Sequence, residues 1–269
     1  MSDPAVTSPT ALSIAGSDPT GGAGLQADLQ VFRAHGVHGA GVVTAITIQD
    51  TQRVHRSLPA FPNVVLEQLR VLLRDVAPAA VKIGMLATDD VARSVLLGLD
   101  ALAPGTPIVL DPVLAASDGT ALLERRAWAT LCEIAQRAAL VTPNVAEAGA
   151  LTGRDASTRA GAEEAARVFA LELGARAVLV KGGHRDGAPD DLLAVRGDDG
   201  TVALEWLPGE RIDAGPVHGT GCALSSAVAA RLARGEPLRD AVAGARAFVA
   251  RAIAAARPIG RGARVLGLG

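Results

Sequence analysis

Aromatic residues are scarce in this chain, which has four Phe, two Trp and no Tyr among 269 residues. Proteins that bind nucleic acid through a basic groove commonly stack bases on aromatic rings within it. Here the 28 acidic residues slightly outnumber the 26 basic ones, so the charge balance also argues against such a groove. We therefore expect no nucleic-acid partner.

Long apolar runs are missing as well. No uninterrupted apolar stretch reaches the roughly 18 residues that a membrane-spanning helix needs, and the start of the chain lacks the basic and apolar regions of a signal peptide. Cysteine is limited to Cys132 and Cys222, which suit a reducing compartment better than a disulfide. The five histidines pair with neither cysteine at a zinc-ligand spacing, and His35 and His38 have no nearby carboxylate cluster to complete a site. We expect a cytoplasmic protein with free thiols, no membrane partner and no structural metal.

Lysine is the third scarce residue, because every basic residue except Lys82 and Lys181 is Arg. The lysine ammonium is a compact charge, whereas the arginine guanidinium is a broad planar fork. Lys181 stands directly ahead of two glycines, which indicates a place where a compact charge is needed. Lys82 is a second candidate for the same reason.

The chain does contain a regular alternation of short β-branched runs with longer Ala/Leu/Arg stretches of helical period. This pattern predicts an α/β fold around a mostly parallel sheet. We expect strands over residues 11–14, 42–48, 80–83, 107–110, 140–142 and 177–180. We expect helices over residues 23–35, 62–77, 88–103, 124–138, 158–173, 222–233 and 239–256.

Two further features complete the predicted organisation. Residues 191–212 contain two β-rich runs around the turn Gly197-Asp-Asp-Gly200, which indicates a short antiparallel hairpin at an edge of the sheet. The sequence shows no internal repeat and no long linker. We therefore expect a single domain over residues 11–269 after a disordered tail over residues 1–10.

Two glycine-rich segments that precede predicted helices are candidate anion sites. Between Ala15 and Gly24, backbone amides could approach a ligand closely, although a tight packing turn explains this segment nearly as well. Between His218 and Cys222, two glycines and a thiol stand at the start of a helix, where free amides and the helix dipole favour a phosphoryl group. The same field is expected to lower the pKa of the Cys222 thiol, which would suit a base or nucleophile. A small buried residue is the alternative.

Three polar groups follow predicted strands: Asp111, the pair Asn144 and Glu147, and Lys181. Because the carboxyl ends of parallel strands share one edge of a sheet, these side chains are expected to converge. Carboxylates with an ammonium suit ATP and its magnesium ion. Asp-Pro and Thr-Pro-Asn are also ordinary turn and helix-cap signals, so each group taken alone carries little weight.

In order along the chain, seven segments resemble the hydroxymethylpyrimidine/phosphomethylpyrimidine kinases of thiamine biosynthesis, a branch of the ribokinase-like superfamily that also contains pyridoxal kinases. The segments are Ala15-Gly-Ser-Asp18 with Gly21-Gly-Ala-Gly24 and Gln26-Ala-Asp28, Thr44-Ala45 through Gln49 and Thr51, Lys82-Ile-Gly-Met-Leu86, Asp111-Pro-Val113, Thr142-Pro-Asn144 with Glu147, Lys181-Gly-Gly-His184, and His218-Gly-Thr-Gly-Cys222. The resemblance spans nearly the whole chain.

The resemblance implies a ribokinase-like three-layer sandwich in which helices flank the sheet. It implies transfer of the γ-phosphoryl group of ATP to 4-amino-5-hydroxymethyl-2-methylpyrimidine, and then to the resulting monophosphate to give the diphosphate. Mg²⁺ accompanies ATP in such enzymes, and they are usually homodimers.

The resemblance also implies roles for particular residues. The residues implied to line the pyrimidine pocket are Gly16, Asp18, Gln49 and Met85, with Gln49 pairing with the ring and its exocyclic amine. Those implied to serve ATP are Asn144, Glu147 and Lys181, and those implied to hold the metal are Asp111 and Glu147. The implied anion hole consists of Gly219, Thr220, Gly221 and Cys222, with Cys222 at the position where pyridoxal kinases carry an Asp base.

Cys222 in place of Asp favours the pyrimidine branch over the second interpretation, a kinase of pyridoxal or of a related hydroxymethyl heterocycle. The chain departs from the family at Asp50, where Asn is frequent, at Ala115-Ala-Ser-Asp-Gly119, which lacks the usual Lys, and over residues 260–269, which lack the usual histidines. These departures bear on which acceptor the protein takes more than on its fold, because the shape of the pocket determines the choice of acceptor. A third interpretation is a ribokinase-fold binding protein without turnover.

Overall fold

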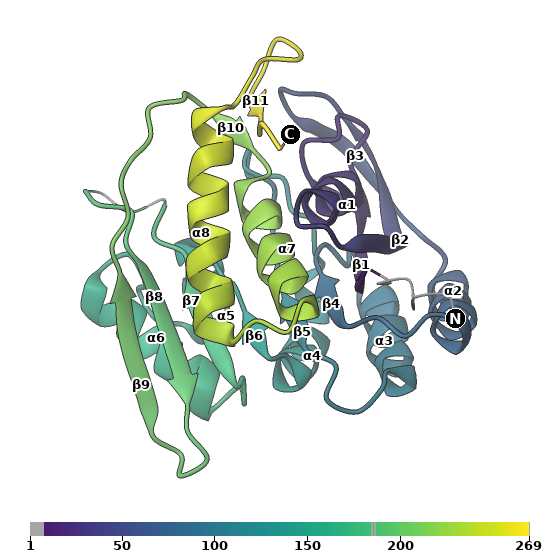
Figure 1. Ribbon diagram of the computed structural model, residues 1–269, viewed down its shortest axis with the longest axis horizontal. Coiled ribbons are helices and arrows are strands. Elements are labelled where there is room, and N and C mark those ends of the chain that lie inside the picture. The colour runs from purple at the N-terminus through teal and green to yellow at the C-terminus, as the bar shows by residue number, and fades with distance from the viewer. Residues whose placement is uncertain (1–7, 184, 186, 269) are drawn as a thin grey trace, which may run out of the picture.

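The computed structural model describes residues 8–183, 185 and 187–268 (Figure 1). Residues 1–7 of the predicted tail lie outside the described residues, as does His184. Thr10, which the tail prediction includes, already begins the first strand.

Within the described residues, one sheet contains nine strands in the order β3-β2-β1-β4-β5-β6-β7-β8-β9. Their bounds are β1 Thr10–Ser17, β2 His38–Gln49, β3 Val54–Pro59, β4 Ala80–Ile83, β5 Ile108–Leu110, β6 Leu140–Val141, β7 Ala177–Val180, β8 Asp191–Arg196 and β9 Val202–Leu207. Strands β2, β1, β4, β5, β6 and β7 are parallel, whereas β3, β8 and β9 are antiparallel to their neighbours. The predicted parallel sheet and its edge hairpin, β8–β9, are confirmed.

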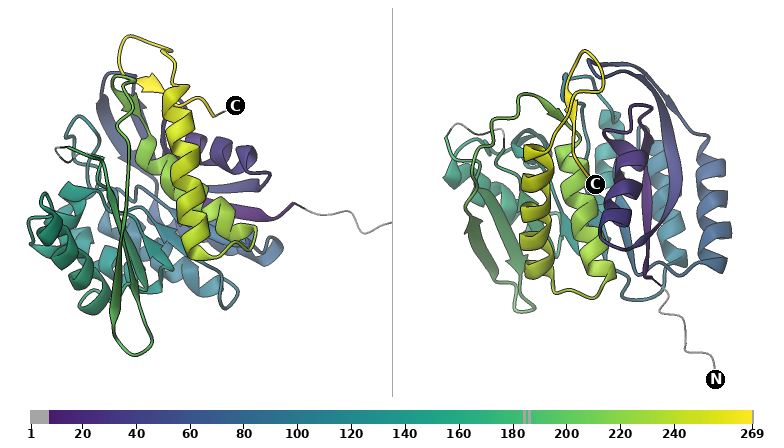
Figure 2. Two further views of the ribbon diagram at one scale, coloured as in Figure 1. Left: turned by 60° about the vertical axis from the view of Figure 1, so that its left-hand side comes forward. Right: turned by 45° about the horizontal axis from the view of Figure 1, so that its top comes forward.

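Helices cover both faces of this sheet, which makes three layers (Figures 1 and 2). Their bounds are α1 Gly24–Ala34, α2 Pro62–Asp75, α3 Asp89–Gly98, α4 Trp128–Arg137, α5 Val145–Thr152, α6 Arg159–Leu171, α7 Thr220–Ala233 and α8 Leu238–Ala254. Short 3-10 turns lie at Leu99–Ala101 and Arg125–Ala127, and a small parallel sheet pairs β10 Val217–His218 with β11 Arg264–Val265. Helices α1, α7 and α8 lie on one face of the main sheet, and α2 to α6 lie on the other.

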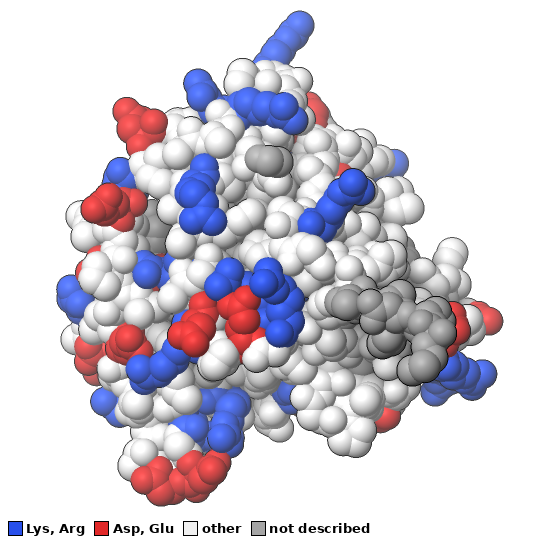
Figure 3. All heavy atoms as spheres, in the orientation of Figure 1, with Lys and Arg blue, Asp and Glu red and all other residues white. Residues whose placement is uncertain are grey.

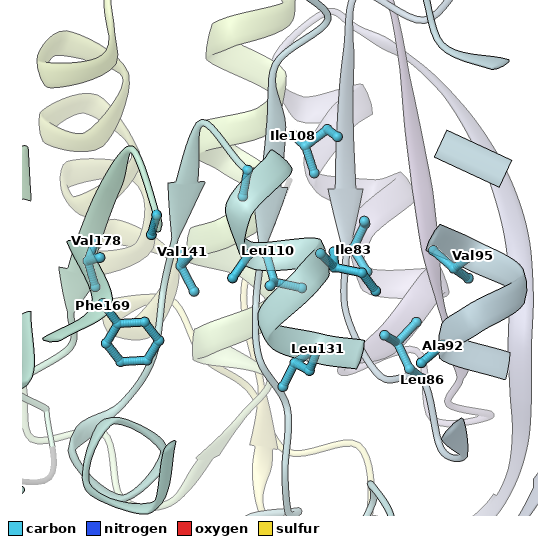
Figure 4. Close-up of a cluster of buried hydrophobic side chains, with 14 of the residues drawn as sticks. Ile83, Leu86, Ala92, Val95, Ile108, Leu110, Leu131, Val141, Phe169 and Val178 are labelled. Carbon is cyan, nitrogen blue, oxygen red and sulfur yellow. The ribbon is translucent and has the colours of Figure 1, made fainter. Parts of the chain in front are cut away.

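Each face has its own apolar core, because successive side chains of a strand point to opposite faces. On the α2 to α6 face, Ile83, Leu110 and Val141 of the central strands pack with Leu131 of α4 and Phe169 of α6 (Figure 4).

The opposite core is built largely from small side chains. Ala223, Ala227 and Ala230 of α7 are fully buried and belong to one cluster with Val109 and Leu140 of the sheet. Small residues let α7 lie close to the sheet, and so the start of α7 comes close to the carboxyl ends of the central strands.

Four elements are absent from the sequence-based expectation: β3, α5 and the two-residue strands β10 and β11. Strand β3 was not predicted because its run Val54-His-Arg-Ser-Leu-Pro59 is mostly polar, yet it pairs antiparallel with β2 and closes that edge of the sheet. Asp50 shapes the connecting turn, since its Oδ1 accepts the backbone N–H groups of Gln52 and Arg53. Helix α5 was also missed, because only eight residues form it.

Two surface properties follow from the arrangement. No helix in the described ranges is both long and apolar enough to cross a membrane. Acidic and basic side chains are interspersed over the face shown in Figure 3.

Candidate active site

A cavity of about 630 Å³ runs along the carboxyl ends of the parallel strands and under the start of α7. Every residue that the sequence analysis singles out as a site residue lines this cavity: Gly16, Asp18, Gln49, Met85, Asp111, Asn144, Glu147, Lys181, Gly219, Thr220, Gly221 and Cys222. These residues lie at or just beyond the ends of β1, β2, β4, β5 and β7 and at the starts of α5 and α7. They meet because parallel strands end at the same edge of the sheet.

Lys181 and Asp111 form an ion pair at the centre of the cavity. The Lys181 ammonium donates to Asp111 Oδ1 at 2.8 Å, and the two side chains are only 14% and 3% exposed. Thr142 Oγ1 donates to the same oxygen at 3.2 Å. Burial opposes the charge of Lys181, but Asp111 and Glu147 outweigh this effect and raise the pKa of the lysine. The ammonium is therefore fully charged at neutral pH.

Asn144 and Glu147 form a capping box at the start of α5. Asn144 Oδ1 accepts the Glu147 N–H at 2.9 Å, and Glu147 Oε2 accepts the Asn144 N–H at 2.7 Å. The helix-cap signal in the sequence is therefore real, and it also turns the Glu147 carboxyl toward the cavity. Burial, joined by the charge of Asp111, raises the pKa of Glu147 to about 7, although Lys181 counteracts the rise.

These groups carry more acidic than basic charge, which suits a cation. Asp111 and Glu147 share one ammonium, Lys181, and the charge of Asp111 adds to burial in raising the pKa of Glu147. Carboxylate oxygens are the ligands that Mg²⁺ prefers, and Mg²⁺ usually keeps several waters and binds through one or two carboxylates together with substrate phosphates. No group of three or more His, Cys, Asp and Glu side chains forms a complete cage within the described part of the chain. The donor set fits a magnesium ion that arrives with a nucleotide.

Cys222 lies in the first turn of α7, as the sequence predicts, but its thiol is not activated. Burial raises the pKa of the Cys222 thiol to about 11, with the charges of Asp111 and Asp28 adding to it and that of Lys82 only partly opposing it. The expected lowering of this pKa by the helix is therefore wrong for the ligand-free site. Burial is the main cause, because the thiolate loses its solvation where water is excluded, and the charges of Asp111 and Asp28 add to this effect.

The two glycine-rich segments interlock beside Cys222. Gly219 has φ +79°, and a Cβ there would lie 1.8 Å from the carbonyl oxygen of Gly22. Gly24 has φ +59°, and its Cβ would lie 2.3 Å from the carbonyl oxygen of Gly16. Only residues without a side chain allow this approach. The packing-turn interpretation of the first segment is therefore valid, and the turn also shapes a wall of the cavity.

One end of the cavity combines an apolar surface with an amide. A Cβ added to Gly16 would lie 2.8 Å from Met85 Sδ, so the methionine packs directly over that glycine. Gln49 extends from the end of β2, with its Oε1 3.2 Å from Thr47 Oγ1 and its Nε2 3.0 Å from His218 Nε2. His218 Nε2 also lies 2.8 Å from Asp18 Oδ2. A flat heterocycle with polar edges fits these surroundings.

Lys82 serves the interior of the protein. Its side chain is fully buried, and its ammonium lies 2.7 Å from Asp28 Oδ2. Ser13 and Ser226 each donate to the same carboxylate at 2.6 Å. Both lysines of the chain thus pair with buried aspartates, in agreement with the inference drawn from their scarcity.

The opposite end of the cavity was missed by the sequence analysis. It is lined by Ala243, Ala247, Ala250 and Ile253 of α8 and by Pro208, Gly209 and Ile212 beyond β9. Arg246 anchors this wall, since its Nε donates to Asp191 at 2.7 Å and its Nη2 donates to the carbonyl oxygens of Leu207 and Pro208. The available signal was the spacing of Ala243, Ala247 and Ala250, which puts three small residues on one helix face.

Comparisons with known proteins agree with this geometry. Residues 18–266 match the phosphomethylpyrimidine kinase family. The chain is 46% identical over 248 residues to a hydroxymethylpyrimidine/phosphomethylpyrimidine kinase of Rhizobium meliloti, with 91% of each chain covered.

Two solved structures are also similar. Pyridoxal kinase of Bacillus subtilis in an ADP complex superposes with a TM-score of 0.86 at 31% identity and 97% coverage of both chains. Phosphomethylpyrimidine kinase of Clostridium difficile gives 0.79 at 33% identity, with 91% of this chain and 99% of that one covered. The fold is therefore the predicted ribokinase-like sandwich, and the chain belongs to the phosphomethylpyrimidine kinase family.

Proposed function

We propose that this protein transfers the γ-phosphoryl group of ATP to 4-amino-5-hydroxymethyl-2-methylpyrimidine and then to its monophosphate, in thiamine biosynthesis. The observation that carries the proposal is one cavity with three features in succession. These are the Gln49 amide, the buried ion pair of Lys181 with Asp111, and the start of the 14-residue helix α7. The similarity to named kinases of this class over most of the chain supports it.

The cavity offers a place for each part of the reactants. The acceptor ring lies between Met85 and Gln49, the phosphates lie at the amides of residues 219–222, and the adenine lies against the small side chains of α8. Lys181 faces the transferring group, and Asp111 with Glu147 would hold the Mg²⁺ that accompanies ATP, which would offset phosphate charge. Asn144 contributes by capping α5 so that Glu147 is held in place.

In the first step, the acceptor hydroxyl oxygen forms a bond to the γ-phosphorus while the bond from that phosphorus to the ADP oxygen breaks, and the hydroxyl proton leaves. With a pKa of about 11, roughly one Cys222 thiol in 10,000 is ionised at pH 7. The loose transition state of phosphoryl transfer needs little deprotonation of the nucleophile until late. Charge neutralisation by Lys181 and the α7 amides is therefore the larger contribution, and the hydroxyl proton passes to Cys222 only through its thiolate, the minor form at pH 7.

The test is an ADP-release assay with Mg·ATP that offers the hydroxymethylpyrimidine, its monophosphate and pyridoxal in parallel, with mass detection of each product. Turnover of both pyrimidines and not of pyridoxal supports the proposal. The similarity to pyridoxal kinase makes pyridoxal the acceptor to exclude, and turnover of pyridoxal alone would assign the protein to that branch. Ligand-induced thermal shifts without any ADP release would indicate a binding protein.

The proposal includes a homodimer in the cytoplasm. Ile46 and Leu58 are cross-strand partners on β2 and β3 and are 57% and 43% exposed, next to Ile48 and to Phe61, which is 78% exposed. Contiguous exposed apolar residues beside an edge strand are typical of a subunit interface. The two free thiols suit a reducing compartment. Sedimentation of the wild type and of Phe61→Asp tests the dimer, which is excluded if the wild type is a monomer at micromolar concentration.

A further inference from the structure

Three side chains from distant segments form a polar chain at the acceptor end of the cavity. His218 Nε2 lies 2.8 Å from Asp18 Oδ2 and 3.0 Å from Gln49 Nε2, and all three residues line the cavity. The His218 ring is held by the glycine-rich turn, because a Cβ on Gly22 would lie 2.8 Å from His218 Cδ2 and 3.0 Å from Val265 Cγ1. The imidazole is therefore packed on one side by the turn and hydrogen-bonded on the other by Asp18.

The protonation state of His218 Nε2 follows from Asp18. Burial opposes ionisation of this carboxyl, but hydrogen bonds from His218 and Thr20 outweigh burial and lower the pKa of Asp18. Asp18 also accepts the Thr20 N–H, the Thr20 hydroxyl and the Ala23 N–H. A carboxylate with these donors around it only accepts hydrogen bonds, so His218 Nε2 carries a hydrogen.

This hydrogen decides which way the Gln49 amide faces. A protonated His218 Nε2 has no lone pair to accept from the Gln49 NH₂ group, whereas the Gln49 carbonyl oxygen can share the hydrogen that goes to Asp18; the two ends of an amide are interchangeable in shape. Thr47 agrees, because its hydroxyl hydrogen goes to the Ser17 carbonyl at 2.9 Å and its oxygen is left to accept from Gln49. Both neighbours therefore select the same orientation, with Oε1 toward His218 and the NH₂ group toward Thr47.

We propose that His218 is a specificity-determining positioning residue that locks the Gln49 amide in the orientation that accepts an aminopyrimidine edge. This inference rests on the proposed function, because it assumes that Gln49 faces the acceptor ring. Oε1 then accepts from the exocyclic 4-amine on the His218 side, and the NH₂ group donates to the adjacent ring nitrogen on the Thr47 side. A 4-oxopyrimidine presents the opposite order of acceptor and donor and needs the amide turned over.

The lock predicts discrimination between two nearly isosteric acceptors. The wild type is expected to prefer the 4-amino substrate to its 4-oxo analogue by about 100-fold or more in kcat/KM, because the wrong edge leaves buried polar groups unpaired. Without His218 the amide can turn over and accept either edge. His218→Phe is therefore expected to reduce the preference to about 10-fold or less, chiefly by raising kcat/KM for the 4-oxo analogue.

The experiment measures kcat and KM for both pyrimidines in the wild type, His218→Phe, His218→Asn and Thr47→Val. Asn restores a donor to Asp18 and is expected to recover part of the preference, whereas Thr47→Val removes the second selector and is expected to weaken it. His38→Phe, on an exposed histidine at the start of β2, is the matched control. Thermal melting confirms that each variant is folded.

A preference that survives both His218→Phe and Thr47→Val overturns the lock and leaves the proposed function intact. Wild-type turnover of neither pyrimidine overturns the proposed function and the lock together. A general loss of activity in His218→Phe on both acceptors, with the preference unchanged, shows a purely structural role and likewise rejects the proposal.

Discussion

The ammonium of Lys181 lies 2.8 Å from the carboxylate of Asp111, although 70 residues separate the two in sequence. A Cβ on Gly221 would come within 3.1 Å of the same ammonium, so the ion pair also lies against the first turn of α7. The pair thus joins the carboxyl ends of β5 and β7 to the start of α7, where we propose that the phosphates bind.

Replacing Lys181 with Met is expected to lower kcat by about 100-fold or more, because one preorganised charge on the transferring group is lost. Steady-state kinetics at saturating ATP, with melting curves to verify folding, measure the effect. Arg176→Met is the matched control, because Arg176 precedes β7 and pairs with Asp198 on the surface, where the side chains are 58% and 87% exposed. Comparable losses in the two variants would contradict a role for Lys181 in phosphoryl transfer.

Glu147→Gln is expected to stabilise the protein above pH 7. The folded-state pKa of about 7 lies above the ordinary value of 4.5, so the folded protein binds this proton more tightly than the unfolded chain does. The resulting stability is fully present below pH 4.5 and is lost as the pH rises to 7. Gln keeps the capping box and removes the charge, which should raise the free energy of unfolding by roughly 2 kcal/mol at pH 8 and little at pH 5.

Urea denaturation at the two pH values measures this difference. Mg²⁺ at pH 8 should stabilise the wild type more than the variant, since it offsets the same charge. A variant less stable than the wild type at pH 8 would show that the Glu147 charge is not a cost to the fold.

Cys222→Ala is expected to reduce the first phosphorylation more than the second. The first acceptor is a hydroxyl that must lose a proton, whereas the acceptor in the second step is a phosphate already ionised near pH 7. We expect a loss of about 100-fold in the first step and under about 10-fold in the second. Separate assays with each acceptor measure the ratio, and Cys132→Ala in α4 is the control. Equal losses would refute a role restricted to proton transfer.

Gly219→Ala is expected to abolish activity, because its Cβ would fall 1.8 Å from the carbonyl oxygen of Gly22 and force the two loops apart. Gly215→Ala tests backbone strain alone, since its φ is +66° and nothing lies within 4 Å of the added Cβ. That control should lose about 1 kcal/mol of stability and keep its turnover. The prediction fails if both variants retain activity.

Much of the fold was predictable from local pattern. Strands β4 and β7 lie at the predicted residues because short runs rich in β-branched residues mark buried strands; β7 is wholly apolar, and β4 is interrupted only by Lys82. The apolar pattern fails where burial is one-sided or the element is short. Strand β3 depends on pairing with β2, and α5 consists of one capping box followed by two turns.

The sequence by itself determined the part of the site that strand ends and glycine-rich turns supply, because these and the two rare lysines can be read along the chain. Only the tertiary structure decided what those residues do to one another. It buried Cys222 with Asp28 and Asp111 nearby, which together raise the pKa of its thiol, and it made α8 a wall of the cavity. Local patterns report what each segment can form, whereas pKa values and amide orientations depend on charges and donors that folding brings from distant segments.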